Sequence, residues 1–278
     1  MFSLDGYRAI RTNGGVVRRT DLGVLVITGA DRASWLQGLV TNDVASLATG
    51  DCRYAAYLTP QGRMITDMNV IARADRLLLG VPASLAAPLR DRLDGLIFAE
   101  DAQVTDQSAV LDIWTSVNAA CEFSDVVVEH GQPHGLRFPE ISLDTFDVVR
   151  VERGMPRFLV DMDTDTIPLE AGIEDRAISF TKGCYVGQEV IVRVTHRGGG
   201  RVAKKLVRWK AVPSAAVVPL PGSRIFSLDK DIGRVTSAVF SPEREAVVGL
   251  GYVHRDFVAP GTEVTVVWND SPTQIVIE

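Results

Sequence analysis

The stretch Y-A-A-Y-L-T-P-Q-G-R-M-I-T-D, Tyr54 to Asp67, decides the fold of the N-terminal half of the chain. Its ends belong to two segments with the composition of β-strands, Tyr54–Leu58 and Met64–Ala72. Between them, Thr59-Pro60-Gln61-Gly62 has the residues of a tight turn. We therefore predict a β-hairpin at this point of the chain.

Segments on both sides of the hairpin predict further strands and helices. One helix begins at a cap, Asp31 or Ser34, carries Trp35 on its apolar side and ends near Thr41. The stretch 119–145 is the least regular, and a loop is expected at 131–135. Strands mixed with helices in this order indicate an α+β fold. The other predicted elements are strands over Val16–Thr28 and Leu77–Val81 and helices over Pro82–Leu96 and Asp144–Glu152.

The sequence pattern changes after Gly198-Gly199-Gly200, where short predicted strands separated by Pro and Gly begin. Strands at such short, even spacing predict a small β-barrel. We therefore expect a domain boundary near residue 200, with domains over 1–200 and 201–278. The predicted barrel strands are Lys205–Trp209, Arg224–Phe226, Gly233–Val239, Ala246–Tyr252 and Glu263–Val267.

Composition limits the class of protein. The chain has 278 residues and a net charge of −6, and no apolar run approaches the roughly 20 residues that a membrane helix needs. We expect a soluble, cytoplasmic protein with no membrane partner. Seven Lys or Arg and no Asp or Glu lie between Arg193 and Lys210, which predicts either an anion-facing surface or a protected strand edge. Direct nucleic-acid binding is not expected, because this segment has few aromatic residues.

The three cysteines, Cys52, Cys121 and Cys184, lie too far apart for a zinc or iron–sulfur cradle or for a disulfide framework. Asp161–Asp165 resembles the start of a calcium loop, but the glycine and the distal glutamate of such a loop are missing. We therefore expect no permanently bound metal and a reducing compartment.

Cys184 stands in an unusual setting, T-K-G-C-Y-V-G-Q-E-V, Thr181 to Val190. Lys182 is placed to lower the pKa of its thiol, and Gly183 and Gly187 allow the backbone to expose the sulfur. If a helix begins at Gln188, Cys184 lies just before the positive end of that helix. If the β-branched run that follows Glu189 forms a strand, no helix end lies near Cys184. The structural alternative is a small buried cysteine that fills a turn.

The segment K-G-C-Y-V-G-Q-E, Lys182–Glu189, resembles the signature of the YgfZ family, whose members are related to the glycine-cleavage T-protein (GcvT). Other segments agree in the same order, so the resemblance spans nearly the whole chain. They are W-L-Q-G-L-V-T-N-D-V at Trp35–Val44, the hairpin at Tyr54–Asp67, R-V-E-R-G-M-P-R at Arg150–Arg157, I-P-L-E at Ile167–Glu170 and G-R-V-T-S at Gly233–Ser237.

This resemblance implies a T-protein-like fold, in which two α+β portions surround a folate-sized cavity beside a C-terminal barrel. It implies a folate-binding protein that assists the assembly or repair of [4Fe–4S] proteins, including radical enzymes that modify tRNA. Its partners would be iron–sulfur client proteins or assembly factors, and Cys184 would be the working thiol. Lys182, Gly183, Tyr185, Gly187, Gln188 and Glu189 would support it. The alternative is a tetrahydrofolate-dependent aminomethyltransferase or demethylase.

The resemblance also implies a site for tetrahydrofolate or a derivative. Tyr54 and Asp67 match residues that contact folate in the enzyme relatives, and Asp67 is the candidate for proton transfer. Glu170 and Trp35 are expected beside the same cavity. Two departures are visible. Thr66 replaces a second aspartate, and Phe146 replaces an arginine, which removes a bidentate donor and weakens the expected folate affinity.

Overall fold

The computed structural model describes residues 1–197, 199–212, 217–269 and 271–278, without the side chain of Arg197. The chain divides into two compact units. The first comprises Met1–Thr145 and Ile173–Ile191, and the second comprises Phe146–Gly172 and Val192–Glu278. Gly198 of the expected linker lies outside the described residues, and the boundary expected near residue 200 stays a prediction.

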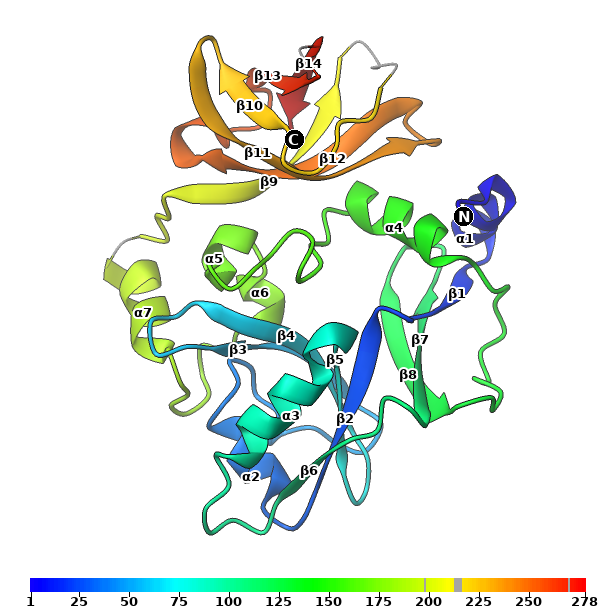
Figure 1. Ribbon diagram of the computed structural model, residues 1–278, viewed down its shortest axis with the longest axis vertical. Helices are drawn as coiled ribbons and strands as arrows, with labels where there is room; N and C mark the ends of the chain where they lie inside the picture. The colour runs from blue at the N-terminus through cyan, green and yellow to red at the C-terminus, as the bar shows by residue number, and fades with distance from the viewer. Residues whose placement is uncertain (198, 213–216, 270) are drawn as a thin grey trace. The chain divides into compact units, whose positions relative to one another are not determined.

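The first unit holds two antiparallel sheets and several short helices, coloured from blue to green in Figure 1. One sheet has the strand order β3-β4-β5-β2-β6 and the other β1-β7-β8. The strands are β1 (Gly15–Arg18), β2 (Leu22–Thr28), β3 (Cys52–Leu58), β4 (Met64–Ala72), β5 (Leu77–Pro82), β6 (Gln103–Asp106), β7 (Leu111–Val117) and β8 (Phe123–Glu129). The helices are α1 (Leu4–Thr12), α2 (Arg32–Gln37), a 3₁₀ turn (Ala83–Leu85), α3 (Ala86–Asp94), α6 (Glu174–Ala177) and α7 (Gln188–Val192), and α4 (Leu143–Glu152) begins here.

The predicted hairpin is confirmed. Strands β3 and β4 pair antiparallel, and Ala56 lies opposite Asp67. Along β4 the side chains alternate, so that Met68 and Val70 enter the core while Asp67 and Asn69 point to the other face. The hairpin therefore carries one apolar face and one polar face, and the polar face holds the candidate folate residues.

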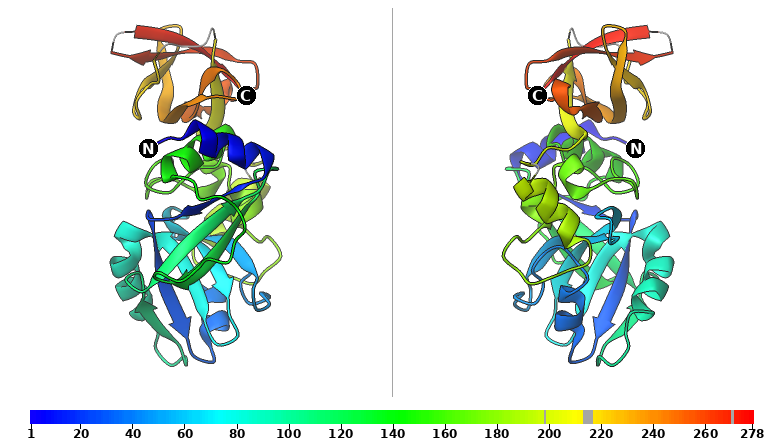
Figure 2. Two further views of the ribbon diagram at one scale, coloured as in Figure 1. Left: turned by 90° about the vertical axis from the view of Figure 1, so that its right-hand side faces the viewer. Right: turned by 90° about the vertical axis from the view of Figure 1, so that its left-hand side faces the viewer.

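The two faces of the larger sheet are covered differently. Figure 2 shows helix α3 along one face of this sheet. Leu89 and Leu93 of α3 belong to the same buried apolar cluster as Leu25 and Leu79 of the sheet. On the opposite face, Ile113 of β7 packs with valines of β2, which brings the smaller sheet against the larger one. Burial of these apolar side chains on both faces is the main favourable term in the stability of this unit.

Three predictions for this unit need correction. The segment Val16–Thr28 forms two strands in different sheets, because the chain turns at Arg19–Asp21. The helix that carries Trp35 ends at Gln37, before the expected Thr41. The stretch 119–145 contains β8, whose mixed exposure gives little alternation for a sequence pattern to detect. The helix predicted over Pro82–Leu96 is confirmed, with a 3₁₀ first turn.

The second unit contains a closed barrel with the strand order β10-β11-β12-β9-β14-β13, as predicted, and Trp209 lies fully buried inside it. A strand absent from the prediction, β14, completes the closure. The strands are β9 (Lys204–Ala211), β10 (Arg224–Ser227), β11 (Lys230–Ser241), β12 (Ala246–His254), β13 (Glu263–Trp268) and β14 (Ser271–Ile277). The helical segments are most of α4, α5 (Pro168–Ala171), a π-helix (Arg193–Arg197) and a 3₁₀ turn (Arg255–Phe257).

Strand β9 pairs with β12 over Lys204–Lys210, but with β14 only at Trp209, Lys210 and Ala211. Among the described residues, the start of β9, with Lys204 and Lys205, has no strand partner on the β14 side. The protected-edge and anion-facing interpretations of the basic segment therefore both stay open.

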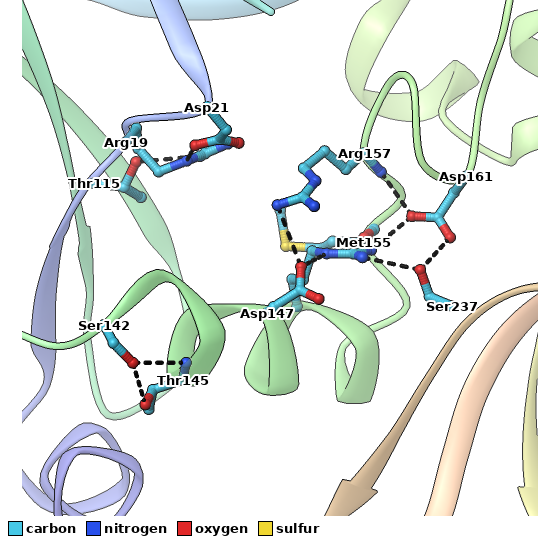
Figure 3. Close-up of polar contacts among 11 residues, drawn as sticks. Arg19, Asp21, Thr115, Ser142, Thr145, Asp147, Met155, Arg157, Asp161 and Ser237 are labelled. Atoms are coloured by element: carbon cyan, nitrogen blue, oxygen red, sulfur yellow. Dashed lines mark hydrogen bonds and ion pairs between the residues drawn. The ribbon is translucent and has the colours of Figure 1, made fainter. Parts of the chain in front are cut away.

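A buried polar network joins the barrel to the loop that follows α4. Asp161 accepts hydrogen bonds from Arg150 Nη1 (2.6 Å), Thr236 (2.6 Å) and Ser237 (2.6 Å). It also accepts one from the backbone of Arg157 at 3.0 Å (Figure 3). The carboxylate that resembled a calcium ligand thus has a structural role as the acceptor at the centre of this network.

Candidate functional site

The candidate site begins with the pair that the sequence singled out on the hairpin. The Tyr54 hydroxyl donates to Asp67 Oδ2 at 2.7 Å. The two side chains lie on the same face because Tyr54 is opposite Asn69 and Ala56 is opposite Asp67 in the β3–β4 register. Asp67 keeps some exposed surface. The pair therefore presents a carboxyl oriented by a hydrogen bond on a half-buried residue.

Burial dominates the electrostatics of the pair. It raises the pKa of the Asp67 carboxyl, an effect that the Tyr54 hydroxyl and nearby arginines only partly offset. It also raises the pKa of Tyr54 well above its ordinary value, so the phenol stays protonated and acts as the donor. A carboxyl whose pKa is moved toward neutrality accepts and releases a proton more readily at physiological pH. The arrangement is suited to general acid–base chemistry.

Arg19 lies on the same polar side, at the chain reversal between β1 and β2. Its guanidinium forms a fork with Asp21, with both N···O distances at 2.8 Å, and reaches Thr115 at 3.4 Å (Figure 3). Its side chain is 11% exposed and its charge favours the ionised form of Asp67. Arg19 thus supplies a fixed positive charge near the carboxyl.

A second arginine covers the tyrosine. The Arg176 guanidinium lies 5.0 Å from the centroid of the Tyr54 ring. Asn42 holds the two segments together, because its amide donates to the carbonyls of Tyr54 (2.9 Å) and Arg176 (2.8 Å). Sequence reasoning missed Arg19 and Arg176, since no spacing or motif links such distant positions to the hairpin. Asn42 lies in the quoted segment Trp35–Val44, but the sequence alone gave it no role.

The adjacent polar residues tie the two sheets together beside the site. Asp125 of β8 accepts from Asn69 at 2.5 Å and from Thr115 at 2.6 Å. One carboxylate therefore joins β4, β7 and β8. Because both of its oxygens are bonded, we assign Asp125 a role in fixing the polar face of the hairpin.

The segment around Cys184 is fixed in place by the side chains of Lys182 and Tyr185. The Lys182 ammonium donates to the carbonyls of Gln37 (2.6 Å), Val40 (2.7 Å) and Asn42 (2.9 Å), at and beyond the end of α2. Tyr185 is buried, which raises its pKa to about 12. Cys184 itself is exposed. The expectation of a buried, turn-filling cysteine is therefore wrong.

The Lys182 ammonium is engaged with three carbonyls, so it anchors the segment. Its expected effect on the Cys184 thiol stays a prediction. The open question about the following residues is settled in favour of a helix, since α7 begins at Gln188, with Glu189 exposed in its first turn. At five residues α7 is too short for its dipole to act strongly on a side chain ahead of it.

Gly187 fixes the backbone of this segment, and Gly183 provides a matched control. Gly187 has φ +84°, and a Cβ there would lie 2.6 Å from the Thr59 carbonyl oxygen, whereas a Cβ at Gly183 would meet open space. We expect Gly187→Ala to destabilise the protein by about 1–3 kcal/mol and Gly183→Ala by less than about 1 kcal/mol. Chemical denaturation of both variants measures the difference, and equal effects would contradict this assignment.

The remaining predicted site residues lie elsewhere. Trp35 is a core residue whose indole donates to the Leu96 carbonyl at 3.2 Å, so its expected place beside a ligand is not what its contacts favour. Thr66 is buried and donates to the Asp67 carbonyl oxygen at 2.9 Å. Phe146 is buried in α4, and Glu170 is buried in α5 of the second unit.

The structure also bears on metal binding and on membrane spanning. Among the described residues no group of three or more His, Cys, Asp or Glu side chains is arranged to hold a metal ion. In the same part of the chain, no helix combines the length and the apolar character that crossing a membrane requires.

Comparison with known proteins gives consistent similarities. A family model described as the GCVT N-terminal domain matches residues 2–114, and one described as the glycine cleavage T-protein C-terminal barrel domain matches residues 204–277. An aminomethyltransferase of Halalkalibacterium halodurans is 26% identical over 94% of this chain and 84% of its own length. One from Halothermothrix orenii is 25% identical over 95% of this chain and 87% of its own.

The fold itself is similar to a solved structure. The glycine cleavage system aminomethyltransferase T from Bartonella henselae superposes with a TM-score of 0.83, covering 99% of this chain and 88% of that chain at 17% identity. This likeness confirms the expected T-protein-like fold with its C-terminal barrel. The folate-sized cavity expected at the centre of that fold stays a prediction.

Proposed function

Because the chain belongs to the GcvT-like superfamily, we propose that it binds a reduced folate beside Tyr54 and Asp67 and transfers an aminomethyl-derived carbon to it. The observation that carries this proposal is the 2.7 Å bond from the Tyr54 hydroxyl to a carboxyl whose pKa is raised by burial. The names of the relatives, aminomethyltransferase in each case, support the reaction class.

The chemistry needs proton transfer and no oxidant. A donor X–CH₂–NH₂, in which X is a leaving group such as a thiolate, gives its methylene carbon to two nitrogens of tetrahydrofolate. The bonds from that carbon to X and to the amine nitrogen break, and HX and NH₃ leave with the two protons that the folate nitrogens release. The product is 5,10-methylenetetrahydrofolate. Asp67 is the group that takes a proton from a folate nitrogen as it attacks.

Tyr54 and the arginines support this step. The tyrosine holds one carboxyl oxygen in place, which leaves the other to face the substrate. Arg19 favours the ionised form of the carboxyl, which is the form that can accept a proton. The hydrogen bond from Tyr54 and the positive charge of Arg19 thus both favour Asp67 as the proton acceptor.

The proposal is tested by calorimetric titration with tetrahydrofolate and by following methylenetetrahydrofolate formation from S-aminomethyl thiols. We expect saturable binding and turnover by the wild type. The absence of binding, or binding without turnover for every donor tested, would count against aminomethyl transfer.

Tyr54→Phe gives a sharper test of the site. The hydroxyl stabilises the ionised carboxyl, so its loss should raise the pKa of Asp67 and move the acidic limb of the kcat/KM profile to higher pH. At neutral pH we expect kcat/KM to fall about tenfold. Tyr57→Phe is the matched control on the same strand, because its ring is 3% exposed in the core. If the acidic limb of the kcat/KM profile stayed at the same pH in Tyr54→Phe, Tyr54 would have no role in the proton transfer.

A second candidate function is the maturation or repair of [4Fe–4S] proteins, as in the YgfZ family, with iron–sulfur client proteins as partners. The observation that favours it is an exposed Cys184 on a segment anchored by Lys182 and Tyr185. Exposure is what a thiol needs for transient contact with another protein or a cluster. The two functions differ in the residue they require, Asp67 for the first and Cys184 for the second.

Cys184→Ser separates the two candidates. The side chain is exposed, so we expect the melting temperature to be unchanged. Under the second function the variant should fail to restore the activity of a [4Fe–4S] enzyme in cells that lack the protein. Cys52→Ser is the control, because Cys52 is also exposed and lies outside the motif. Full restoration by Cys184→Ser would exclude a role for this thiol.

A further inference from the structure

The second unit has a recess of about 360 Å³ on the outside of its barrel, bounded by strands β9 to β12 and by α5. Its position follows from strand alternation, because Ile225, Val235 and Val253 point into the barrel core and their neighbours point outward. Arg224 lies opposite Arg234, and Arg234 lies opposite Tyr252. The polar residues that line the recess include Glu170, Lys204, Arg224, Arg234, Tyr252 and His254.

The hydroxyl of Tyr252 lacks a hydrogen-bond partner among the described residues. Tyr252 is 3% exposed, and its oxygen is fully covered. Burial raises the pKa of Tyr252, and the Thr166 hydroxyl lies near enough to offset part of that rise, but its hydrogen bonds are both to Asp163, and it forms none with the Tyr252 hydroxyl. A buried hydroxyl without a partner is costly, and a ligand or an ordered water that accepted its hydrogen bond would remove that cost.

Two cations beside this hydroxyl have unused donor capacity. The Lys204 ammonium lies 4.9 Å from the Tyr252 ring centroid, and its ion pair with Glu170 is long, at 3.9 Å. Arg234 has one ion pair among the described residues, with Asp163 at 3.4 Å, although a guanidinium carries five N–H donors. Donors from β9, β11 and β12 thus converge on one recess.

The lining combines these donors with apolar surface from Ala203 and Ile232. The lining cations Lys204, Arg224 and Arg234 each have a carboxylate partner, but those of Lys204 and Arg234 are at 3.9 and 3.4 Å, too long for a strong ion pair. We propose that this recess is a second ligand site, separate from the Tyr54–Asp67 pair, that binds a small organic anion through its carboxylate or phosphate group. The acidic group would meet Lys204, Arg234 and the Tyr252 hydroxyl, and the carbon skeleton would lie on the apolar wall.

The test uses the full-length ¹⁵N-labelled protein and NMR titration with glutarate, glycerol phosphate and, as the neutral control, glutaramide. We expect one of the two anions to bind with a Kd of about 1 mM or below, and glutaramide not to bind. Glutarate binding would identify a carboxylate ligand, and glycerol phosphate binding would identify a phosphate ligand. The absence of binding by both anions up to about ten times that concentration would overturn the proposal.

Tyr252→Phe removes only the hydroxyl. Because that hydroxyl has no partner in the free protein, the variant should melt at the same temperature or higher, while the Kd of the bound anion rises about tenfold. A lower melting temperature would show that the hydroxyl has a structural partner, and the proposal would fail. An unchanged Kd would have the same consequence.

Lys204→Met supplies a second variant, with Lys210→Met as the matched control on the same strand and the same outer face of β9. The first should raise the Kd at least tenfold, and the second should change it less than twofold. An equal rise of the Kd in both variants would mean that anion binding depends only on the overall charge of the protein, and the proposed site would be rejected. Asp67→Asn should leave anion binding unchanged, so loss of binding in that variant would contradict a separate site.

Discussion

Asp67→Asn is expected to lower folate-dependent transfer by about 10²–10⁴-fold in kcat/KM while leaving the free protein at least as stable as the wild type. The amide still accepts a hydrogen bond from Tyr54, but it cannot take a proton. At the same time it removes a charge that burial disfavours. We expect a gain on the order of 1 kcal/mol, measured by chemical denaturation at pH 7.

The gain in stability should depend on pH with a definite sign. The pKa of Asp67 is raised in the folded protein, so between its unfolded and folded values the native state binds more protons than the unfolded state. Wild-type stability therefore falls as the pH rises through that window, whereas Asp67→Asn lacks this contribution. The variant should exceed the wild type most at neutral pH, and the advantage should disappear as the pH falls toward 4.

Asp112→Asn is a control for which we expect a change in stability of the opposite sign. Although burial opposes it, bonding to Arg18 and His130 lowers the pKa of Asp112, so the ionised form is favoured in the folded state. This variant should lose stability at neutral pH and leave transfer unchanged. If Asp67→Asn retained the wild-type rate, or were destabilised as much as Asp112→Asn, the assignment of Asp67 as the proton acceptor would be wrong.

The parts of the fold that local pattern encodes could be predicted. The hairpin at Tyr54–Asp67 and the short barrel strands follow from alternation and turn residues, which act over a few positions. Strand β14 was missed because Pro272 lies within it, and proline argues against a strand. Its place opposite β13 is set by barrel closure, which no short window of sequence contains.

The candidate site shows a similar division. Tyr54 and Asp67 could be proposed because they lie in one continuous, recognisable segment. Arg176 over the Tyr54 ring and Arg19 beside Asp21 depend on contacts made only after the sheets have packed. The anchoring of Lys182 to the end of α2 joins positions far apart in the chain and leaves no periodic signal. Such contacts are determined by tertiary structure, so sequence alone does not reveal the anchoring role of Lys182.

The largest effect on stability is expected from Asp161→Ala. The Asp161 carboxylate is buried and accepts hydrogen bonds from Arg150, Thr236 and Ser237, each at 2.6 Å. Its removal leaves the Arg150 guanidinium, which is 3% exposed, without its most buried counter-charge. We expect a loss of about 3–5 kcal/mol in the free energy of unfolding, because breaking a buried pair costs more than the pair contributes. Urea denaturation followed by circular dichroism measures it.

Asp256→Ala is the matched control in the same unit, since Asp256 pairs with Arg255 at 3.8 Å while 65% exposed. Solvent screens such a pair, so its loss should cost less than about 1 kcal/mol. The double variant Arg150→Met with Asp161→Leu removes both charges and should be more stable than Asp161→Ala alone, because no buried charge is then left unpaired. If Asp161→Ala costs no more than Asp256→Ala, the network is not what joins the loop after α4 to the barrel, and apolar packing against Val248 and Leu250 must be sufficient.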